Sequence, residues 1–483
     1  MPFHTDLIHA VSLPLGILSI ASHLEKYGYE VKIVDFSVRR TSVKKEYDLF
    51  KPDIVGLSFP SVKAIDGVVA ISKFFRKKNI PIVWGGPFVD LGELPHLFQT
   101  GLVDIVSFCE GEATWLDLLR TIESGGDLAN VQGIAYLKEG EIVTTVPRPF
   151  MDPLELPRLN FDLLDGLPDY FHYLYGCNRL AYVYLSKGCP AHCTFCVNTL
   201  CHRNTRRRRK LSDFISELTE LVTKYGADGF YFADELAFAN DKEMYEVCDA
   251  FDATGLSFHW GFQTRIGCLS DAAIQRAYNS GCRWMDFGVE SGSKKILKEV
   301  KKAIPYDRIE PTFSACNRTG LISIANFIIG FPGETEEDVR ESIALAKRLE
   351  STQNTFARFI FGTKTPAGKA VMAKTDQYPH FYNLNDYKRM DLYKNKQALS
   401  LIPQKELDVI QSYFLMSAIF RKDYQSSRSY DLLFKSVLTV VKRFPTMGFV
   451  CFVKALYEIS SDFLRMGFDL ILHPGIRKKY QLD

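Results

Sequence analysis

The chain has 483 residues, enough for two to four domains, and its 46% hydrophobic and 24% charged residues are typical of a globular protein. The net charge of +2 gives no support to a strongly charged partner. We expect neither a signal peptide nor a membrane span, because the sequence has no basic-then-apolar leader and no run of about 18 apolar residues. Its 11 cysteines, an odd number, then favour reduced thiols and a cytoplasmic location.

Residues 1–150 alternate between short apolar strands and amphipathic helices. Strands are expected at 30–36, 54–59, 81–84 and 104–108, and helices at 17–27, 64–77 and 113–124. This alternation predicts a doubly wound parallel sheet of Rossmann-like type, which binds ligands at the carboxyl ends of its strands. Ser58 and the pair Gly85-Gly86 lie at such ends, where glycine lets a ligand approach the backbone.

A connecting region follows over 125–175, with a small hairpin expected at 133–136 and 141–146. A strand at 182–185 then precedes three cysteines in the spacing C-x3-C-x2-C, namely Cys189, Cys193 and Cys196. A closed structural zinc or iron–sulfur site usually takes four protein ligands, so three thiolates leave one coordination position without a protein ligand. Cys201 and His202 follow closely enough to keep a zinc knuckle as the alternative.

Residues 175–372 show six apolar strands separated by helices. The strands are expected at 182–185, 229–233, 258–262, 284–288, 322–329 and 355–361, and the helices at 213–225, 242–254, 271–280 and 336–349. The count predicts a partial (β/α)6 barrel of TIM-like type, in which chemistry takes place on the loops after the strands. Polar and glycine-rich segments stand at those positions: Asp234-Glu235, Gln263-Thr-Arg265, Gly288-Val-Glu-Ser-Gly292 and Ile329-Gly-Phe-Pro-Gly-Glu334.

Residues 373–483 are expected to form a helical C-terminal domain rich in Phe, Tyr, Leu and Met. An ordinary helical bundle is the favoured interpretation, and a lid over a hydrophobic substrate or a peripheral membrane contact is the alternative. The basic run Arg206 to Lys210 is interpreted as a loop near the cysteines or a contact to a corrinoid phosphate. Binding of nucleic acid is the weaker interpretation of that run.

The cysteine triad and the segments after the strands together resemble the radical SAM superfamily. The resemblance covers about residues 178–370. It implies that Cys189, Cys193 and Cys196 hold a [4Fe-4S] cluster whose fourth iron is chelated by S-adenosylmethionine. It also implies the residues that bind S-adenosylmethionine: Phe195, Asp234, Glu235, Arg265, Glu290, Ser291, Ile329 and Gly330.

The first 115 residues resemble the cobalamin-binding domain of class B radical SAM enzymes. The matching segments are Pro14-Leu-Gly16, Val31 to Asp35, Pro52 to Ser58, Trp84-Gly-Gly-Pro87 and Glu110-Gly-Glu112. The resemblance implies that cobalamin lies against Pro14, Gly16, Ser58, Gly85, Gly86, Pro87, Glu110 and Gly111. The sequence departs from the family in two places: Cys109 replaces a usual glycine, and only Leu7 to Val11 offers a first strand.

A cobalamin-dependent radical SAM enzyme is therefore expected, and the resemblance implies a methyltransferase that acts on an unactivated carbon or phosphorus through a 5′-deoxyadenosyl radical and methylcobalamin. A non-methylating rearrangement, cyclisation or oxidation is the second hypothesis, and a non-catalytic cluster- or corrinoid-binding protein is the third. The expected partners are a small-molecule substrate, hydrophobic or lipid in character, and an electron donor such as flavodoxin or ferredoxin. The sequence identifies no catalytic acid or base.

Overall fold

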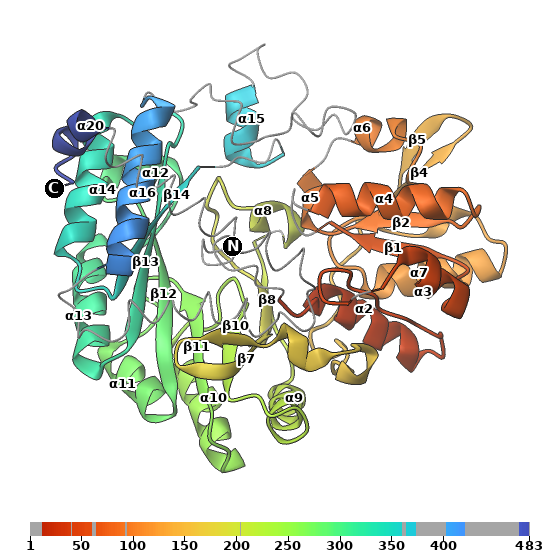
Figure 1. Cartoon of the computed structure of the whole chain (residues 1–483), viewed down its shortest axis with the longest axis horizontal. Helices are drawn as coiled ribbons and strands as arrows, with labels where there is room; N and C mark the ends of the chain where they lie inside the picture. The colour runs from red at the N-terminus through yellow and green to blue at the C-terminus, as the bar shows by residue number, and fades with distance from the viewer. Residues whose placement is uncertain are drawn as a thin grey trace.

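The computed structural model describes residues 12–39, 41–59, 64–91, 94–202, 204–359, 364–372, 402–420 and 473–482. Two sheets form two lobes that lie side by side (Figure 1). The short strand β8 (Ser186–Gly188) and the short helix α8 (Asn198–Cys201) lie between the lobes. The segment that carries the cysteine triad connects these two elements, so it lies at the junction of the lobes.

The N-terminal lobe is built on a five-stranded sheet in the order β1-β2-β3-β4-β5. Its strands are β1 (Val55–Ser58), β2 (Ile82–Gly85), β3 (Ile105–Ser107), β4 (Ile134–Lys138) and β5 (Glu141–Thr144). Its helices are α2 (Leu15–Lys26), α3 (Val43–Phe50), α4 (Ile65–Arg76), α5 (Pro87–Leu91), α6 (Leu94–Gln99) and α7 (Glu112–Glu123). β1, β2 and β3 are parallel, and the hairpin β4-β5 continues the sheet in antiparallel fashion. The predicted doubly wound sheet is confirmed.

The strand expected at 30–36 is not formed. A strand exists only where a neighbour pairs with it, and β1 is the edge of the described sheet on that side. The described residues offer the segment 30–36 no pairing partner, so a β-rich composition is not enough here. The strand-like segment Leu7 to Val11 lies outside the described residues.

The second lobe is a curled sheet in the order β14-β13-β12-β11-β10-β7-β6. Its strands are β6 (His172–Leu174), β7 (Cys177–Val183), β10 (Gly229–Phe232), β11 (His259–Thr264), β12 (Cys282–Glu290), β13 (Ile322–Ile329) and β14 (Gln353–Arg358). Six of them run parallel and β6 is antiparallel to β7. The partial barrel of six parallel strands is therefore confirmed, with the first strand beginning five residues earlier than expected.

Helices cover the outer face of this half-barrel (Figure 1). They are α9 (Leu211–Thr223), α10 (Asp241–Thr254), α11 (Asp271–Asn279), α13 (Ile309–Thr319) and α14 (Glu336–Arg348). The short helix α12 (Lys294–Glu299) instead contributes Ile296 to an apolar cluster with Phe195 and Phe331. The helix starts follow from local sequence: Asn240 caps α10 by accepting from the Glu243 N–H, and Thr335 and Asp338 form a capping box on α14. Such caps fix where each preceding loop ends, and these loops form the rim of the barrel.

One hydrophobic cluster joins the two lobes. Leu18 and Ala21 of α2 belong to the same cluster of buried side chains as Tyr184, Leu185 and the barrel core. The N-terminal lobe also has a second cluster of its own beneath β1 and β2, centred on Trp84 and Phe59. Helix α2 is thus packed against the barrel core through this cluster and against α7 of its own lobe.

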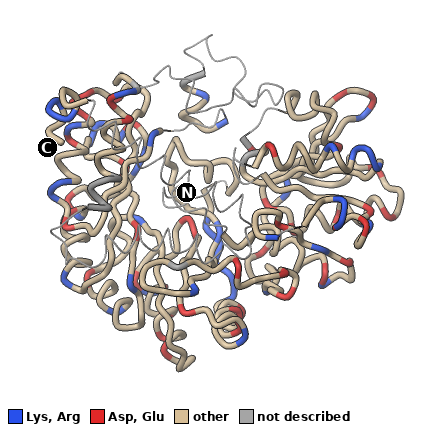
Figure 2. Tube along the Cα trace, viewed as in Figure 1, with Lys and Arg blue, Asp and Glu red and all other residues tan. Residues whose placement is uncertain are grey.

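Three described helices follow the last strand: α15 (Pro366–Met372), α16 (Gln404–Phe420) and α20 (Pro474–Lys479). The rest of the expected helical domain, at 373–401 and 421–472, lies outside the described residues. Within the described ranges, every helix lacks the length or the apolar character needed to cross a membrane. Basic and acidic residues are interspersed over both lobes (Figure 2).

Candidate functional site

The three cysteines lie on the segment between β8 and α8. Cys189 and Cys193 are buried and Cys196 is half-buried. Burial raises the pKa of the Cys196 thiol to about 11, and the neighbouring Cys193, Cys189 and Glu290 add to this effect. Cys189 and Cys193 thus lie near enough to Cys196 to act on its thiol, and a metal ion would be needed to hold the Cys196 sulfur as a thiolate. Among the described residues, no three His, Cys, Asp or Glu side chains, the cysteine triad included, are already gathered in the arrangement of a metal site.

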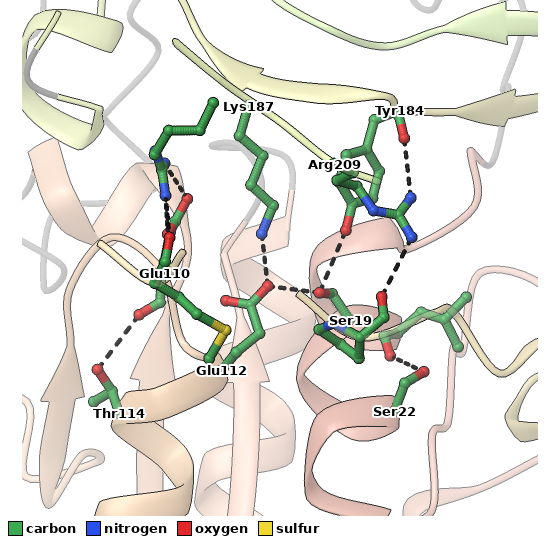
Figure 3. A network of polar contacts seen from close by, with 12 residues as sticks. Ser19, Ser22, Glu110, Glu112, Thr114, Tyr184, Lys187 and Arg209 are labelled. Atoms are coloured by element: carbon green, nitrogen blue, oxygen red, sulfur yellow. Dashed lines mark hydrogen bonds and ion pairs between the residues drawn. The ribbon is translucent and has the colours of Figure 1, made fainter. Parts of the chain in front are cut away.

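The segment before the triad is tied to the N-terminal lobe by a buried ion pair. Lys187 of β8 donates to Glu112 at the start of α7 over 2.6 Å, and Ser19 of α2 donates to the same carboxylate oxygen over 2.6 Å (Figure 3). Burial opposes ionisation of Glu112, but Lys187 and Ser19 outweigh it and lower the pKa of the carboxyl to about 2. Lys187 lies two residues before Cys189, so this contact anchors the cysteine segment directly.

A second ion pair runs parallel to the first. Strand β9 (Arg206–Arg208) pairs with β8, which sets Arg207 opposite Lys187. Arg207 donates to both carboxylate oxygens of Glu110, over 2.8 and 2.5 Å, and its guanidinium lies 4.1 Å from the ring centre of Phe150. We call Glu110-Gly111-Glu112 with Lys187 and Arg207 the interlobe clamp. It joins the loop after β3 to the β8-β9 ribbon.

The prediction of a loop for the basic run is therefore wrong at Arg206 to Arg208, which form a strand. Each arginine has an acidic partner within the chain. The pairs are Arg206 with Glu243, Arg207 with Glu110, Arg208 with Glu246, and Arg209 with Glu217. Structural ion pairs account for this run, and the charges are neutralised internally instead of being presented to a phosphate.

Asp234 and Glu235 follow β10 and both point at the cysteine segment. Asp234 accepts from the Leu185 N–H and from the Ser186 N–H and hydroxyl, and burial raises the pKa of its carboxyl to about 6 despite these bonds. Glu235 accepts from the Gly188 N–H over 2.8 Å. Neither residue caps a helix, because α10 begins at Asp241 behind its own cap Asn240. Both carboxylates instead hold the ribbon that precedes the triad.

Glu290 ends β12 at a bulge and adopts a positive φ of 66°. Its carboxylate accepts from Lys302 over 2.7 Å, and the two side chains are 11% and 8% exposed. A left-handed glutamate at a strand end is an uncommon conformation that is often found at functional sites. Ser291 is fully buried and bonds to Ser342 of α14, so its hydroxyl serves the packing of that helix.

Lys302 was missed by sequence reasoning, which considered only its neighbour Lys301. Lys301 is exposed as expected, whereas Lys302 turns inward to Glu290. The short length of α12 could have revealed Lys302. Because the helix ends at Glu299, the chain turns back toward the barrel mouth directly afterwards, and Lys302 lies on that returning segment.

Arg265 directly follows β11. Its Nη1 lies 3.7 Å from the Cys193 sulfur and its Nη2 donates to the Ala303 carbonyl over 2.5 Å. Among the described residues no carboxylate forms an ion pair with it. The structure thus brings Arg265 to the triad itself.

An apolar cluster lies beside the triad. Phe195 packs on Phe331 with ring centres 5.6 Å apart, and Ile328 and Phe359 belong to the same cluster. Side chains alternate across a strand, so Ile329 faces the other way and is buried in the barrel core. Gly330 has a φ of +88°, and its N–H donates to Glu334, whose carboxyl has its pKa raised to about 8 by burial.

The residues expected at cobalamin lie at the carboxyl edge of the N-terminal sheet, as predicted for Ser58, Gly85 and Pro87. Gly86 has a φ of +103°, and a Cβ there would lie 2.9 Å from the Phe59 carbonyl. Pro14 and Gly16 open α2, and a Cβ on Gly16 would meet no atom within 4 Å. The open Gly16 and the uncapped first turn of α2 fit a bulky ligand, whereas Gly86 is explained by the nearby Phe59 backbone.

Two expected cobalamin residues are engaged elsewhere. Glu110 belongs to the interlobe clamp. Gly111 is explained by packing, because a Cβ there would lie 2.4 Å from the Ile20 Cδ1 atom of α2. Family resemblance alone could not separate these structural roles from contacts to a ligand.

A cavity of about 260 Å³ lies beside the clamp. Residues of both lobes line it, among them Asp90, Cys109, Arg148, Phe150, Leu200 and Lys364. Cys201 donates to Asp90 over 3.4 Å, and His202 lies 3.4 Å from Glu235. These contacts account for Cys201 and His202 without a zinc knuckle.

Comparison with known families agrees with this geometry. Residues 183–346 match the radical SAM superfamily, and residues 8–119 match the B12 binding domain. The chain therefore has a radical SAM domain and a B12 binding domain, a combination that matches cobalamin-dependent radical SAM enzymes. A 4Fe–4S cluster, S-adenosylmethionine and cobalamin are the cofactors that these two families imply.

Several named proteins are similar over most of the chain. An uncharacterized methyltransferase, PH0819 of Pyrococcus horikoshii, is 28% identical over 73% of this chain and 76% of its own length. Cytidylyl-2-hydroxyethylphosphonate methyltransferase of Streptomyces wedmorensis is 26% identical over 71% and 74%. The anaerobic magnesium-protoporphyrin IX monomethyl ester cyclase of Synechocystis is 25% identical over 68% and 67%.

A solved structure shares the fold. The radical S-adenosylmethionine methyltransferase TsrM from Kitasatospora setae, with cobalamin and a 4Fe–4S cluster bound, has a TM-score of 0.70 at 15% identity. The match covers 94% of this chain and 97% of that one.

Proposed function

We propose that the chain is a methyltransferase that places a methyl group on an unactivated carbon or phosphorus centre of a small molecule. The observation that carries this proposal is the interlobe clamp, which fastens the loop at the carboxyl edge of the B12-binding sheet to the ribbon before the cysteine triad. A reaction that uses a radical and a methyl carrier on one substrate needs the two cofactor sites to share one interface. The names of the relatives, which include a phosphonate methyltransferase and a hopanoid C-3 methylase, support the same reaction class.

When bound, the cluster with S-adenosylmethionine supplies a carbon radical and cobalamin supplies a methyl carrier. Cys189, Cys193 and Cys196 would hold the cluster, and three thiolates would leave one iron for the methionyl end of S-adenosylmethionine. Glu290, which is held by Lys302, would accept hydrogen bonds from polar groups of that ligand. Phe195 with Ile328 and Phe331 offers an apolar surface for a planar ring.

Other residues act by shaping the site. Asp234 and Glu235 hold the backbone of residues 185–188 and thereby fix where the cysteine segment begins. Gly330, in left-handed conformation, and Glu334 shape the turn after β13 at the barrel mouth. The edge formed by Pro14, Gly16, Ser58, Gly85, Gly86 and Pro87 would receive cobalamin.

A second candidate is a non-methylating radical reaction, and the similarity to the magnesium-protoporphyrin monomethyl ester cyclase favours it. A hydrophobic or lipid substrate, a flavodoxin- or ferredoxin-type electron donor and a cytoplasmic location remain predictions. The substrate prediction follows from the apolar C-terminal sequence, and the electron donor follows from the one-electron chemistry of the cluster. The location follows from the odd number of cysteines.

Product analysis separates the candidates. The anaerobically reconstituted chain is incubated with S-adenosylmethionine, a reductant and cell extract, and S-adenosylhomocysteine and 5′-deoxyadenosine are counted. Methyl transfer predicts that S-adenosylhomocysteine and 5′-deoxyadenosine both accumulate in proportion to the product. It also predicts that a label on the methyl group of S-adenosylmethionine is recovered in a small molecule. 5′-Deoxyadenosine alone would favour a rearrangement. Full biological activity in a Cys193→Ala variant would contradict both enzymatic candidates and favour a non-catalytic binding protein.

A further inference from the structure

The guanidinium of Arg265 is held at two points on the cysteine side of the barrel. Nη2 donates to the Ala303 carbonyl over 2.5 Å, and Nη1 lies 3.7 Å from the sulfur of Cys193. A planar guanidinium that is fixed at one nitrogen has its other nitrogen aimed in a set direction. Arg265 is therefore oriented toward Cys193 by the backbone of the chain itself.

The segment that anchors Arg265 is itself tied to the cysteine loop. The Thr194 N–H, next to Cys193, donates to the Val300 carbonyl over 3.0 Å. Two residues further on, Lys302 is bound to Glu290. Backbone contacts thus join the segment of Cys193 to the segment of Ala303, the two segments that Arg265 bridges.

The positive charge of Arg265 is not neutralised by any carboxylate among the residues that the structure describes. Cys193 is only 6% exposed and Arg265 is half-buried, so water screens the charge from the sulfur only in part. The remaining arginines near the triad, at 206–209, all have acidic partners. Arg265 is thereby distinguished as a cation that contacts a sulfur of the triad and forms no ion pair with a described carboxylate.

We propose that Arg265 raises the reduction potential of the iron–sulfur cluster by donating a charge-assisted hydrogen bond to Cys193. The inference rests on the proposed function, since it takes Cys193 as a cluster ligand. Reduction adds one electron, from the external donor, to the cluster and makes it more negative. A hydrogen bond and a positive charge at a ligand sulfur stabilise that reduced form, so they move the potential upward. Arg265 acts through Cys193 and so belongs with the residues that tune the cluster, whereas the sequence assigned it to the carboxylate of S-adenosylmethionine.

The test is an anaerobic redox titration of the reconstituted protein without S-adenosylmethionine, followed by electron paramagnetic resonance. We expect Arg265→Gln to shift the midpoint to a more negative potential. Arg265→Lys keeps the positive charge but lacks the two-nitrogen guanidinium, so its midpoint should lie between those of the parent and Arg265→Gln. Arg283→Gln is the matched control, because Arg283 donates to the Tyr278 and Cys282 carbonyls at the start of β12, the opposite end of the strand from Glu290. Its midpoint should equal that of the parent.

Affinity for S-adenosylmethionine, measured by equilibrium dialysis, tests the competing role of Arg265 as a residue that binds S-adenosylmethionine. Our proposal predicts that both Arg265 variants keep the parent affinity within about twofold. An unchanged midpoint, with or without a large loss of that affinity, would overturn it. If Arg265→Gln takes up no iron, the comparison of Arg265→Lys with the parent decides by the same criteria. Failure of the parent itself to take up a cluster would instead contradict the proposed function.

Discussion

The ion pair between Lys187 and Glu112 determines how firmly the two lobes are joined. The two side chains are 17% and 3% exposed, and the charged atoms lie 2.6 Å apart. Lys187→Met keeps most of the side-chain volume and removes the ammonium group. The Glu112 carboxylate then stays buried with only the Ser19 hydroxyl as a side-chain donor.

The magnitude follows from the pKa of Glu112. Burial opposes its ionisation, yet Lys187 and Ser19 bring the pKa from 4.5 to about 2. At about 1.4 kcal/mol for each pKa unit, this difference corresponds to about 3 kcal/mol of stability. Breaking one side of a buried ion pair costs about 3–5 kcal/mol. We therefore expect Lys187→Met to lower the free energy of unfolding by about 3 kcal/mol. Because the folded pKa is depressed, the contribution is present above pH 4.5 and is lost as the pH falls from 4.5 toward 2.

The assay is urea unfolding of the cofactor-free chain, followed by tryptophan fluorescence. Trp84 and Trp115 report on the N-terminal lobe, and Trp260 and Trp284 report on the barrel. Lys44→Met is the control, because Lys44 forms an exposed pair with Asp48 within one helix and its loss should leave the midpoint unchanged. A double variant, Lys187→Met with Glu112→Leu, should recover part of the loss because no unpaired charge remains. Equal midpoints for Lys187→Met, Lys44→Met and the parent at pH 7 would refute the reasoning.

Three further predictions test separate parts of the structure. Cys193→Ala should lose the iron and the visible absorbance of the reconstituted protein. Cys316→Ala, which alters a buried core thiol, should keep both. An iron content of Cys193→Ala equal to that of the parent would exclude Cys193 as a ligand. Gly261→Ala should destabilise the barrel by about 1–3 kcal/mol or more, because the new Cβ would lie 2.2 Å from the Trp284 ring. Gly475→Ala is the control, because a Cβ there would meet no atom within 4 Å. Equal urea midpoints for the two variants would contradict a steric overlap with Trp284. Burial raises the pKa of Asp286 from 3.8 to about 7, so the folded chain favours the protonated carboxyl. The stability that this preference contributes is complete below about pH 4 and is lost as the pH rises to about 7. Asp286→Asn should flatten that decline in urea midpoints measured between pH 5 and 8, and an unchanged slope would show that Asp286 ionises as freely as in the unfolded chain.

The parallel strands and the cysteine segment were predictable because their signals are local. An apolar run followed by a polar rim residue defines each barrel strand, and five of the six expected strands lie within about two or three residues of their predicted bounds. The segment 30–36 shows the limit of such reasoning. Its composition favours a strand, but pairing requires a neighbour that composition does not encode.

The candidate site was less predictable where a residue has a partner far along the chain. Glu110 pairs with Arg207, 97 positions away, and this pair explains both the acidic loop and the basic run. Lys302 could not be distinguished from Lys301 by type or spacing, since only the turn after α12 decides which one faces Glu290. Ile328 and Ile329 differ only in the face of the strand that each occupies, which fixes the apolar surface beside Phe195.

The most direct test of the central claim is metal analysis of the anaerobically reconstituted chain after supply of iron, sulfide and hydroxocobalamin. The account predicts about four irons and one cobalt in each chain, with the iron lost and the cobalt kept in the Cys193→Ala variant. Four irons without cobalt would contradict the claim that both cofactors meet at the interlobe clamp, and the reaction would then be sought among radical reactions that use no cobalamin.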